Sequence, residues 1–537
     1  MMQPDLSLVD PLDHHLATRV NVGDTLTRTA ALFPERRAVI DGTREVTFRE
    51  LAQTADRLGH ALLGLGLGPG TPVALLMTNS WRMLATYYAC ARAGLVCLPL
   101  NVMLTAEDLT WIVGDAEAPI LVVDPALRQK AEGIVTGAAS IATVVVAEDE
   151  PAPVADRRTI GWDGLVATGM EGPLDAMVDE RGAVQCLYTS GTTSRPKGVL
   201  TSHVSVTIGL LSNAIVTRQR WGSEPPVMLV VLPLFHVTAL NTLAMPVIMM
   251  GGTVVLPGAG FDPAAVLDAL SAHHATHVMM LPMMHAACAA EQARTPRDLT
   301  SVECAIYAMA PMPENLLAKV DEMYPNAAVI LGSGQTEVVP ATVMQWPEHR
   351  HTAAASWGPQ VPSVLTRTMS RPDGDLLGQG ETGEIVYRAP NVCLGYWNNA
   401  AANQEAFANG WFHSGDIGHV DSEGVVWFTD RLKDIIKSGG ENVSSVAVEA
   451  TVLAAPGVAE CSVVGVPDER WGEAVCAVVV PDGTVPVGEL PDRVIEYARS
   501  RLGGFQVPEV VRLVDALPKT ATGKIQKFEV RAQARDR

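Results

Sequence analysis

The first part of the chain alternates two patterns of hydrophobic and polar positions. Residues 48–65 repeat apolar side chains with the period of an amphipathic helix, and residues 83–93 are helix-like as well. Short apolar runs of β type lie at residues 72–77, 120–123, 143–146 and 184–188. This alternation predicts a large, layered α/β body.

The pattern changes after about residue 430. Compact strand-like runs at residues 458–466, 474–480 and 510–514 flank a helix-like run at residues 490–501. They predict a separate small α+β domain, and the charged stretch at residues 430–434 suits a short hinge. We therefore expect an N-terminal domain over residues 1–430 and a C-terminal domain over residues 431–537.

One long segment lacks charge altogether, because no Asp, Glu, Lys or Arg lies between Glu224 and Asp262. Proline and glycine divide it into a strand-like run at 227–232, a helix-like run at 240–250 and a second strand-like run at 253–256. None of these reaches the ~20 residues of a membrane-spanning helix. The segment predicts a buried core beside an apolar cavity, with no membrane span.

Composition and charge narrow the class of protein. The 537 residues are 48% hydrophobic and 18% charged, which is typical of a globular enzyme. A net charge of −20 would repel a nucleic-acid backbone, so we expect no nucleic-acid partner. The eight cysteines show no CxxC pair, which predicts reduced core thiols. The acidic N-terminus lacks the basic residues of an export signal, which favours a cytoplasmic location.

Residues 188–198, YTSGTTSRPKG, directly follow a predicted strand. Glycine lets the backbone approach a ligand, Ser and Thr supply short donors, and Lys197 adds a positive charge. An ordinary Ser/Gly-rich surface turn is the alternative, but this density of donors favours a phosphate-binding loop. The run does not match GxxxxGK[ST], which excludes the nucleotide-triphosphatase loop of that pattern.

Further motifs follow in a fixed order: LPLFH at 232–236, AMAP at 308–311, GQTE at 334–337, GEI at 383–385, SGD at 414–416, DRLKD at 430–434 and PKTATGK at 518–524. With these motifs the chain resembles, from about residue 22 to 530, the adenylate-forming superfamily of acyl-CoA synthetases, luciferases and peptide-synthetase adenylation domains. The resemblance implies a large N-terminal α/β domain of several subdomains and a mobile C-terminal α+β domain. It also implies that a carboxylate attacks the α-phosphorus of ATP and that a nucleophile then opens the acyl-adenylate, with Mg²⁺ and lysines supplying positive charge.

The resemblance implies a nucleotide site built from several motifs. The residues that close over the β- and γ-phosphates would be Thr189, Ser190, Gly191, Thr192, Thr193 and Lys197. Further nucleotide contacts would come from Ala310, Pro311, Ser333, Gly334 and Gln335. Thr336 would contact the α-phosphate and Glu337 would bind Mg²⁺. Asp416 would accept hydrogen bonds from the ribose hydroxyls, assisted by Arg431.

The resemblance also implies the residues that act in catalysis and domain movement. Lys524 would reach from the small domain to bridge the carboxylate and the α-phosphate, so its loss should impair chemistry more than binding. Lys433 would be the hinge between an adenylating and a thioester-forming arrangement. In the thioester-forming arrangement, the tunnel for the acceptor thiol would be lined by Lys437, Ser438, Gly439 and Gly440, although any tight turn can show such a sequence.

The resemblance places His236 beside the acid pocket, whose walls would include Val237, Thr238, Leu240, Met309 and Met312. These walls are largely apolar and favour a medium or long alkyl, an alicyclic or an aryl acid. No Asp follows His236 to pair with an amine, so an amino acid substrate is disfavoured. A buried core histidine and methionine core filling are the structural alternatives.

Two departures from the superfamily pattern affect the nucleotide site. Ser333 stands where many relatives carry an aromatic residue against adenine, so we do not expect that stacking. Met309 stands in AMAP where many have GGAP, and we expect it to reshape the acyl or adenine space.

The sequence thus predicts an ATP-dependent, AMP-forming acid–CoA ligase with Mg²⁺ as cofactor and CoA as co-substrate. One alternative is an amide-forming synthetase in which an amine intercepts the adenylate. The other is an inactive acyl- or nucleotide-binding protein, against which the joint presence of Glu337, Asp416 and Lys524 argues. The sequence leaves open whether a second copy of the chain is a partner.

Overall fold

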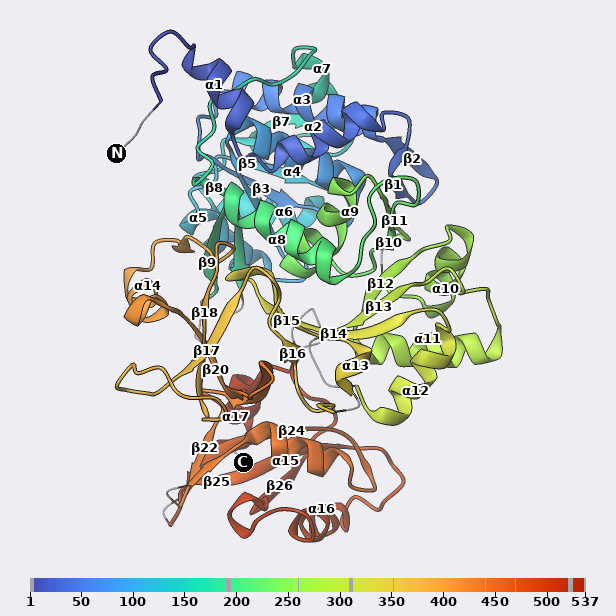
Figure 1. Ribbon diagram of the computed structural model, residues 1–537, viewed down its shortest axis with the longest axis vertical. Coiled ribbons are helices and arrows are strands. Elements are labelled where there is room, and N and C mark those ends of the chain that lie inside the picture. Colours follow the sequence, from blue (N-terminus) through green and yellow to red (C-terminus); the bar gives the residue numbers. More distant parts are fainter. Residues whose placement is uncertain are drawn as a thin grey trace. The chain divides into compact units, whose positions relative to one another are not determined.

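The computed structural model describes residues 4–189, 195–258, 260–308, 312–350, 352–439, 441–468, 470–519 and 525–535. The chain divides into two compact units (Figure 1). The first unit comprises Met1–Leu365 and Arg388–Glu405, and the second comprises Thr366–Tyr387 and Ala406–Arg537. The boundary predicted between residues 430 and 431 therefore lies inside the second unit, because strands before residue 430 group with later ones. A hinge near Lys433 stays a prediction.

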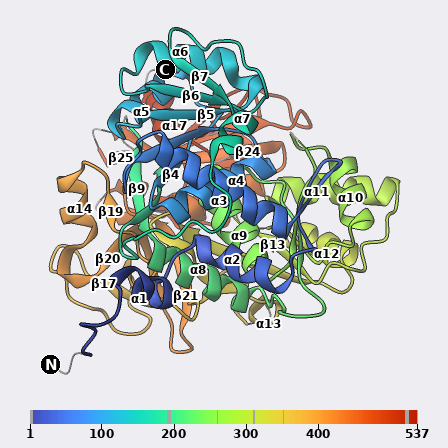
Figure 2. The same ribbon diagram turned by 90° about the horizontal axis from the view of Figure 1, so that it is seen from above.

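The first unit contains two eight-stranded sheets. In one sheet, four neighbouring parallel pairs join β3 (Pro72–Leu76), β4 (Val96–Pro99), β5 (Ile120–Val123), β6 (Thr143–Val146) and β7 (Arg158–Gly161). At the other edge, β8 (Ala183–Thr189) pairs in parallel with β4, and antiparallel pairing then adds β9 (Lys197–Ser202) and β19 (Gly395–Tyr396). Helices α5 (Ala106–Asp115) and α6 (Arg128–Gly137) cover one face, and α3 (Phe48–Gly64) and α4 (Trp81–Ala93) cover the other (Figure 2). This layered arrangement confirms the predicted α/β body.

The second sheet of the first unit has the order β15-β14-β13-β12-β10-β11-β1-β2. Its strands are β1 (Arg37–Asp41), β2 (Arg44–Thr47), β10 (Val227–Leu229), β11 (Thr253–Leu256), β12 (His277–Met280), β13 (Cys304–Tyr307), β14 (Ala328–Gln335) and β15 (Val338–Gln345). Helices α10 (Pro263–Ala272), α11 (Pro282–Arg294) and α12 (Glu314–Met323) pack their apolar residues against it.

The uncharged segment forms part of this core. Strands β10 and β11 enclose a π-helix, η2 (Thr238–Ala244), that continues as α9 (Met245–Met249). The strand-like run at 227–232 ends early, at Leu229, and the helix-like run begins with a π-turn instead of an α-turn. Within the described residues no helix is both long and apolar enough to cross a membrane.

The second unit is of α+β type. Strands β17 (Leu365–Met369), β18 (Gly383–Arg388), β20 (Phe412–Val420) and β21 (Val425–Arg431) lie side by side in the order β21-β20-β18-β17. A second sheet contains β22 (Ile436–Ser438), β23 (Glu441–Val443), β24 (Val458–Asp468), β25 (Gly472–Pro481) and β26 (Val510–Leu513). Alternate residues of β24 and β25 face α15 (Ser445–Leu453) and α16 (Leu490–Arg499) on one side and α17 (Lys527–Arg535) on the other.

Shorter or peripheral elements complete the described chain. They are α1 (Pro11–Thr18), α2 (Gly23–Leu32), α7 (Trp162–Thr168), α8 (His203–Val216), α13 (Pro347–Arg350), α14 (Ala400–Ala406), β16 (Gly358–Pro359) and the 3₁₀-helices η1 (Pro125–Leu127), η3 (Ala408–Gly410) and η4 (Gly504–Gln506). All eight cysteines are buried and free, as predicted. Burial raises the pKa of the Cys186 thiol to about 12, so this side chain is a neutral core group.

Candidate active site

The two ends of the predicted phosphate loop lie next to each other. Antiparallel pairing of β8 with β9 sets Thr189 opposite Lys197. The ammonium of Lys197 lies 4.9 Å from the ring centroid of Tyr396, at a distance that gives a cation–π interaction. Tyr396 is brought there by β19, which pairs with β9 across almost two hundred residues of sequence.

The Thr336–Glu337 pair forms the turn between β14 and β15, with Thr336 buried and Glu337 half-buried. The Tyr396 hydroxyl donates a hydrogen bond to Glu337 Oε1 at 3.0 Å. The backbone of Glu337 is also fixed, because its carbonyl accepts a hydrogen bond from Cys393 N at 2.7 Å. Tyr396 therefore connects the predicted phosphate-binding lysine with the predicted metal-binding glutamate. Tyr396 lies outside the sequence motifs. It reaches Lys197 and Glu337 only because β19 pairs with β9.

Gly334 has a structural reason to be glycine. A Cβ at this position would lie 2.3 Å from the carbonyl oxygen of Pro340, on the facing strand of the β14–β15 hairpin. The neighbouring Ser333 accepts a hydrogen bond from Thr342 Oγ1 at its carbonyl. Nucleotide contacts by Ser333, Gly334 and Gln335 stay predictions.

His236 is half-buried at the start of the π-helix. Its Nδ1 lies 3.3 Å from Thr238 Oγ1. Val237 is 5% exposed and Leu240 is fully buried, so both belong to the packed interior, and a role in lining the acid pocket stays a prediction.

Asn79 holds the LPLFH motif in place. Its side chain donates to Leu232 O at 2.8 Å and accepts from Leu234 N at 2.7 Å. Asn79 itself lies outside the sequence motifs, and only the fold brings it to residues 232–236.

In the second unit, Asp416 of β20 and Arg431 of β21 are cross-strand neighbours. Arg431 Nε lies 2.8 Å from Asp416 Oδ1, and the carboxylate is almost completely buried. Ser414 Oγ accepts a hydrogen bond from Asp416 N at 3.0 Å, which fixes the SGD turn. A buried carboxylate balanced by a guanidinium is a suitable acceptor for sugar hydroxyls.

Glu384, from the GEI motif, contacts the SGD turn. It is 1% exposed and pairs with Arg371 and His413, both at 2.8 Å. Its second oxygen accepts a hydrogen bond from Gly415 N at 3.1 Å. The sequence identified the motif but no role for its glutamate.

Hydrogen bonds fix the start of the predicted hinge segment. Asp430 accepts hydrogen bonds from the amide and hydroxyl of Ser445, at 2.5 and 2.7 Å. Lys433 and Lys437 are exposed. Gly439 adopts a φ of +60° in the β22–β23 connection, which favours glycine at this turn.

Several predicted residues lie outside the described residues. They are Ser190, Gly191, Thr192, Thr193, Met309, Ala310, Pro311, Gly440 and Lys524. Their roles stay predictions.

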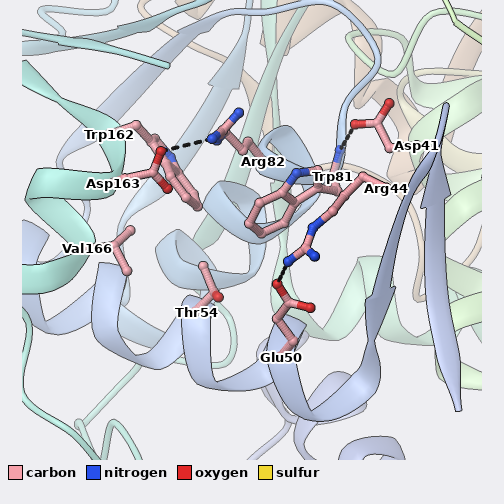
Figure 3. Close-up of a pocket in the computed structure, with 9 residues that line it drawn as sticks. All are labelled: Asp41, Arg44, Glu50, Thr54, Trp81, Arg82, Trp162, Asp163 and Val166. Carbon is pink, nitrogen blue, oxygen red and sulfur yellow. Dashed lines mark hydrogen bonds and ion pairs between the residues drawn. The ribbon is translucent and has the colours of Figure 1, made fainter. Parts of the chain in front are cut away.

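A separate pocket of about 540 Å³ lies in the first unit (Figure 3). It is lined by Asp41, Arg44, Glu50, Thr54, Trp81, Arg82, Trp162, Asp163 and Val166, none of which is a predicted site residue. Arg44 pairs with Glu50 and Arg82 with Asp163, so both guanidinium groups are already neutralised. Burial raises the pKa of Asp41, which accepts a hydrogen bond from Trp81 N.

The α/β unit with a lysine–tyrosine–glutamate cluster and the α+β unit with a buried aspartate–arginine pair have the fold of an adenylate-forming enzyme. The family model of AMP-binding enzymes matches residues 26–397, and that of the AMP-binding enzyme C-terminal domain matches residues 447–524. The chain belongs to this family of AMP-binding enzymes. It uses ATP and is an AMP-forming acid–CoA ligase.

The chain is similar to enzymes that act on different acids. A feruloyl-CoA synthase of an Amycolatopsis species is 36% identical over 515 residues, covering 95% of this chain and 98% of that protein. A long-chain-fatty-acid–CoA ligase of Mycobacterium tuberculosis is 32% identical over 525 residues, covering 96% and 98%. The crystal structure of an anthranilate CoA ligase in complex with anthranoyl-AMP is 25% identical, has a TM-score of 0.85 and covers 97% and 98%.

Proposed function

We propose that this ligase activates an apolar carboxylic acid as acyl-AMP through residues of both units and transfers the acyl group to CoA. The observation that carries the proposal is the placement of Tyr396 between Lys197 and Glu337. A cation and a phenol on the paired strands β9 and β19 can hold the oxygens of a polyphosphate, while the carboxylate at the β14–β15 turn can bind a metal ion. In the second unit, Asp416 would accept the ribose hydroxyls while Arg431 balances its charge.

The donor atoms near Glu337 fit Mg²⁺. Its half-buried carboxylate and the adjacent Thr336 hydroxyl are oxygen donors, which this ion prefers. Across the described ranges no three His, Cys, Asp or Glu side chains gather into a protein-only metal site. This favours an ion held by one carboxylate together with phosphate oxygens. When bound, it would supply positive charge that offsets the charge on the phosphates.

We infer that Lys524 acts in the first half-reaction. In the neighbourhood of the PKTATGK motif, an isolated bridge pairs Lys519 with Ile525, and Gln526 N donates to Pro518 O at 2.9 Å. Lys519 and Ile525, the described residues on either side of this stretch, are therefore paired with each other. The Lys524 ammonium, brought to the α-phosphate, would stabilise the negative charge that develops on the phosphate oxygens.

A Lys524→Ala variant tests this role. Acid-dependent ATP–pyrophosphate exchange should fall by about 10²–10³-fold, as for the loss of one charge-stabilising donor. Preformed acyl-AMP should still be converted with CoA at close to the wild-type rate. Lys519→Ala is the matched control on the same motif and should retain most of the exchange. Equal loss of both half-reactions in Lys524→Ala would contradict the assignment.

The acid class and the acceptor require a direct assay. Pyrophosphate release should be measured over medium and long alkyl, alicyclic and aryl acids, with CoA or an amine as acceptor and the product identified by mass. We expect release with apolar acids and a CoA thioester as product. An amide product would identify the enzyme as an amide synthetase. Absence of acid-dependent release over the whole panel would favour an inactive binding protein.

We also infer a cytoplasmic location. ATP and CoA are cytoplasmic substrates, and eight free buried thiols suit a reducing compartment. Sedimentation of the purified chain would test whether it forms a homodimer.

A further inference from the structure

A buried pair of amide side chains lies next to the π-helix of the first unit. Gln185 and Asn241 are both 0% exposed. Gln185 Nε2 donates to Asn241 Oδ1 at 3.1 Å, and Asn241 Nδ2 donates to Gln185 Oε1 at 3.2 Å. The Tyr87 hydroxyl, on α4, donates to the same Gln185 oxygen at 2.7 Å. Three side chains from a helix, a strand and the π-helix thus form one hydrogen-bonded group.

This group stands in an apolar environment. Leu240, Leu243 and Ala244, which surround Asn241 in sequence, are completely buried. Two apolar side chains of similar volume would bury without a polar cost, whereas buried amides require matched partners. The gain from an amide pair is geometric, because its two hydrogen bonds form only at one separation and orientation.

The geometry fixed here is a π-turn. Met245 N donates to Leu240 O, five residues earlier, in place of the four-residue bond of an α-helix. The carbonyl of Thr242, two residues after Leu240, is held from another helix, because Asn213 Nδ2 of α8 donates to it at 2.6 Å. A π-turn is rare in itself and persists where such contacts stabilise it.

The pair joins two parts of the proposed site. Gln185 lies on β8, four residues before Thr189, at the entry to the phosphate loop. Asn241 lies three residues after Thr238 and five after His236, at the proposed acid pocket. A change in the π-turn would move Val237 and Thr238 relative to the strand that leads to the nucleotide.

We propose that the Gln185–Asn241 pair, oriented by Tyr87, is a positioning device that fixes the π-turn and thereby sets which acids the enzyme accepts. This inference rests on the proposed role of residues 236–240 in acid binding. The three side chains are buried in the core. They act by holding the backbone that carries the pocket wall.

Asn241→Leu and Gln185→Met remove the pair while keeping volume. Each should raise the KM for the acid by about tenfold, leave the KM for ATP within about twofold, and change the ratio of kcat/KM between an aryl and an alkyl acid by about fivefold or more. The exchanged pair, Gln185→Asn with Asn241→Gln, should restore part of the selectivity. Tyr87→Phe, which is milder, should give a smaller change in the same direction.

Thr86→Val is the matched control. Thr86 neighbours Tyr87 on α4, is completely buried and accepts a hydrogen bond from Trp162 Nε1 at 3.2 Å, away from the π-helix. It should lower the melting temperature without changing the acid ratio. If the pair is only structural, Asn241→Leu and Gln185→Met will behave like Thr86→Val, and the proposal is overturned.

Hydrogen exchange of backbone amides provides a readout besides activity. Exchange over residues 238–245 should become faster in Asn241→Leu and Tyr87→Phe, but not in Thr86→Val. Unchanged exchange in both variants would overturn the proposal. A wild-type enzyme without acid-dependent pyrophosphate release would instead remove the proposed function, while the exchange data would still decide whether the pair fixes the turn.

Discussion

At the scale of single residues, the site depends on side chains that connect the motifs. Tyr396 contacts Lys197 through its ring and Glu337 through its hydroxyl. Glu384 has the same kind of role in the second unit, where it holds the SGD turn that carries Asp416. The motif residues supply charge and hydrogen-bonding groups, and these connecting residues determine where those groups lie.

Tyr396→Phe separates the two roles of this tyrosine. The ring under Lys197 remains, but Glu337 loses a hydrogen bond, which for a charged acceptor is worth about 1.5–3 kcal/mol. We expect kcat/KM for ATP to fall by about tenfold or more in an ATP–pyrophosphate exchange assay.

Trp427→Phe is the matched control, because Trp427 Nε1 also donates to a carboxylate, Asp421 Oδ2, at 2.7 Å and lies outside the motifs. It should leave kcat/KM for ATP nearly unchanged. Wild-type kinetics in Tyr396→Phe would show that the Tyr396–Glu337 contact does not serve the nucleotide site.

At the scale of elements, the β14–β15 hairpin illustrates how packing places a motif. Thr336 and Glu337 lie at its turn, and the two strands are antiparallel with an irregular register between Ser333 and Gln335. Close approach of Gly334 to Pro340 lets the strands meet at this irregularity. The turn and its two functional side chains therefore depend on a backbone contact.

Gly334→Ala should disturb this hairpin, because the new Cβ would lie 2.3 Å from Pro340 O, and backbone cannot move aside easily. We expect a loss of stability of about 1–3 kcal/mol by urea unfolding, together with reduced ATP–pyrophosphate exchange.

Gly332→Ala, on the same strand, provides the comparison. Its Cβ would meet Ile306 Cγ2 at 3.5 Å, an ordinary contact, so stability and exchange should stay close to wild type. Equal effects of the two substitutions would refute the importance of the Gly334–Pro340 approach.

At the scale of the whole molecule, the proposed residues divide between two units, each with its own core. Lys197, Glu337 and His236 belong to the first unit, and Asp416 and Arg431 to the second. Polar groups are also buried within these cores. Burial lowers the pKa of His285 to about 4, so this core histidine stays neutral in the folded protein.

This buried histidine predicts a pH dependence of stability. Between about pH 6.5 and pH 4 the unfolded chain binds a proton at His285 that the folded chain does not, so folding becomes less favourable as the pH falls. The contribution is about 1.4 kcal/mol per pH unit within this window. His285 Nε2 lies 3.2 Å from Ile306 O. His285→Gln, whose amide can also donate to this carbonyl, should show a smaller loss of stability from pH 7 to pH 5 in urea unfolding. An identical loss in both proteins would contradict this prediction.

The sequence alone determined the fold class, the AMP-forming ligase chemistry and the bounds of many elements. The runs at 120–123, 143–146 and 253–256 coincide with strands, because a short apolar run bounded by turns encodes a buried strand locally. Contacts between distant segments required the tertiary structure. The pairing of β19 with β9 brings Tyr396 to Lys197, and the partner of Asn241 decides that its helix begins as a π-turn. Strands before residue 430 join the second unit for the same reason, since pairing partners far apart in the chain leave no trace in the local hydrophobic pattern.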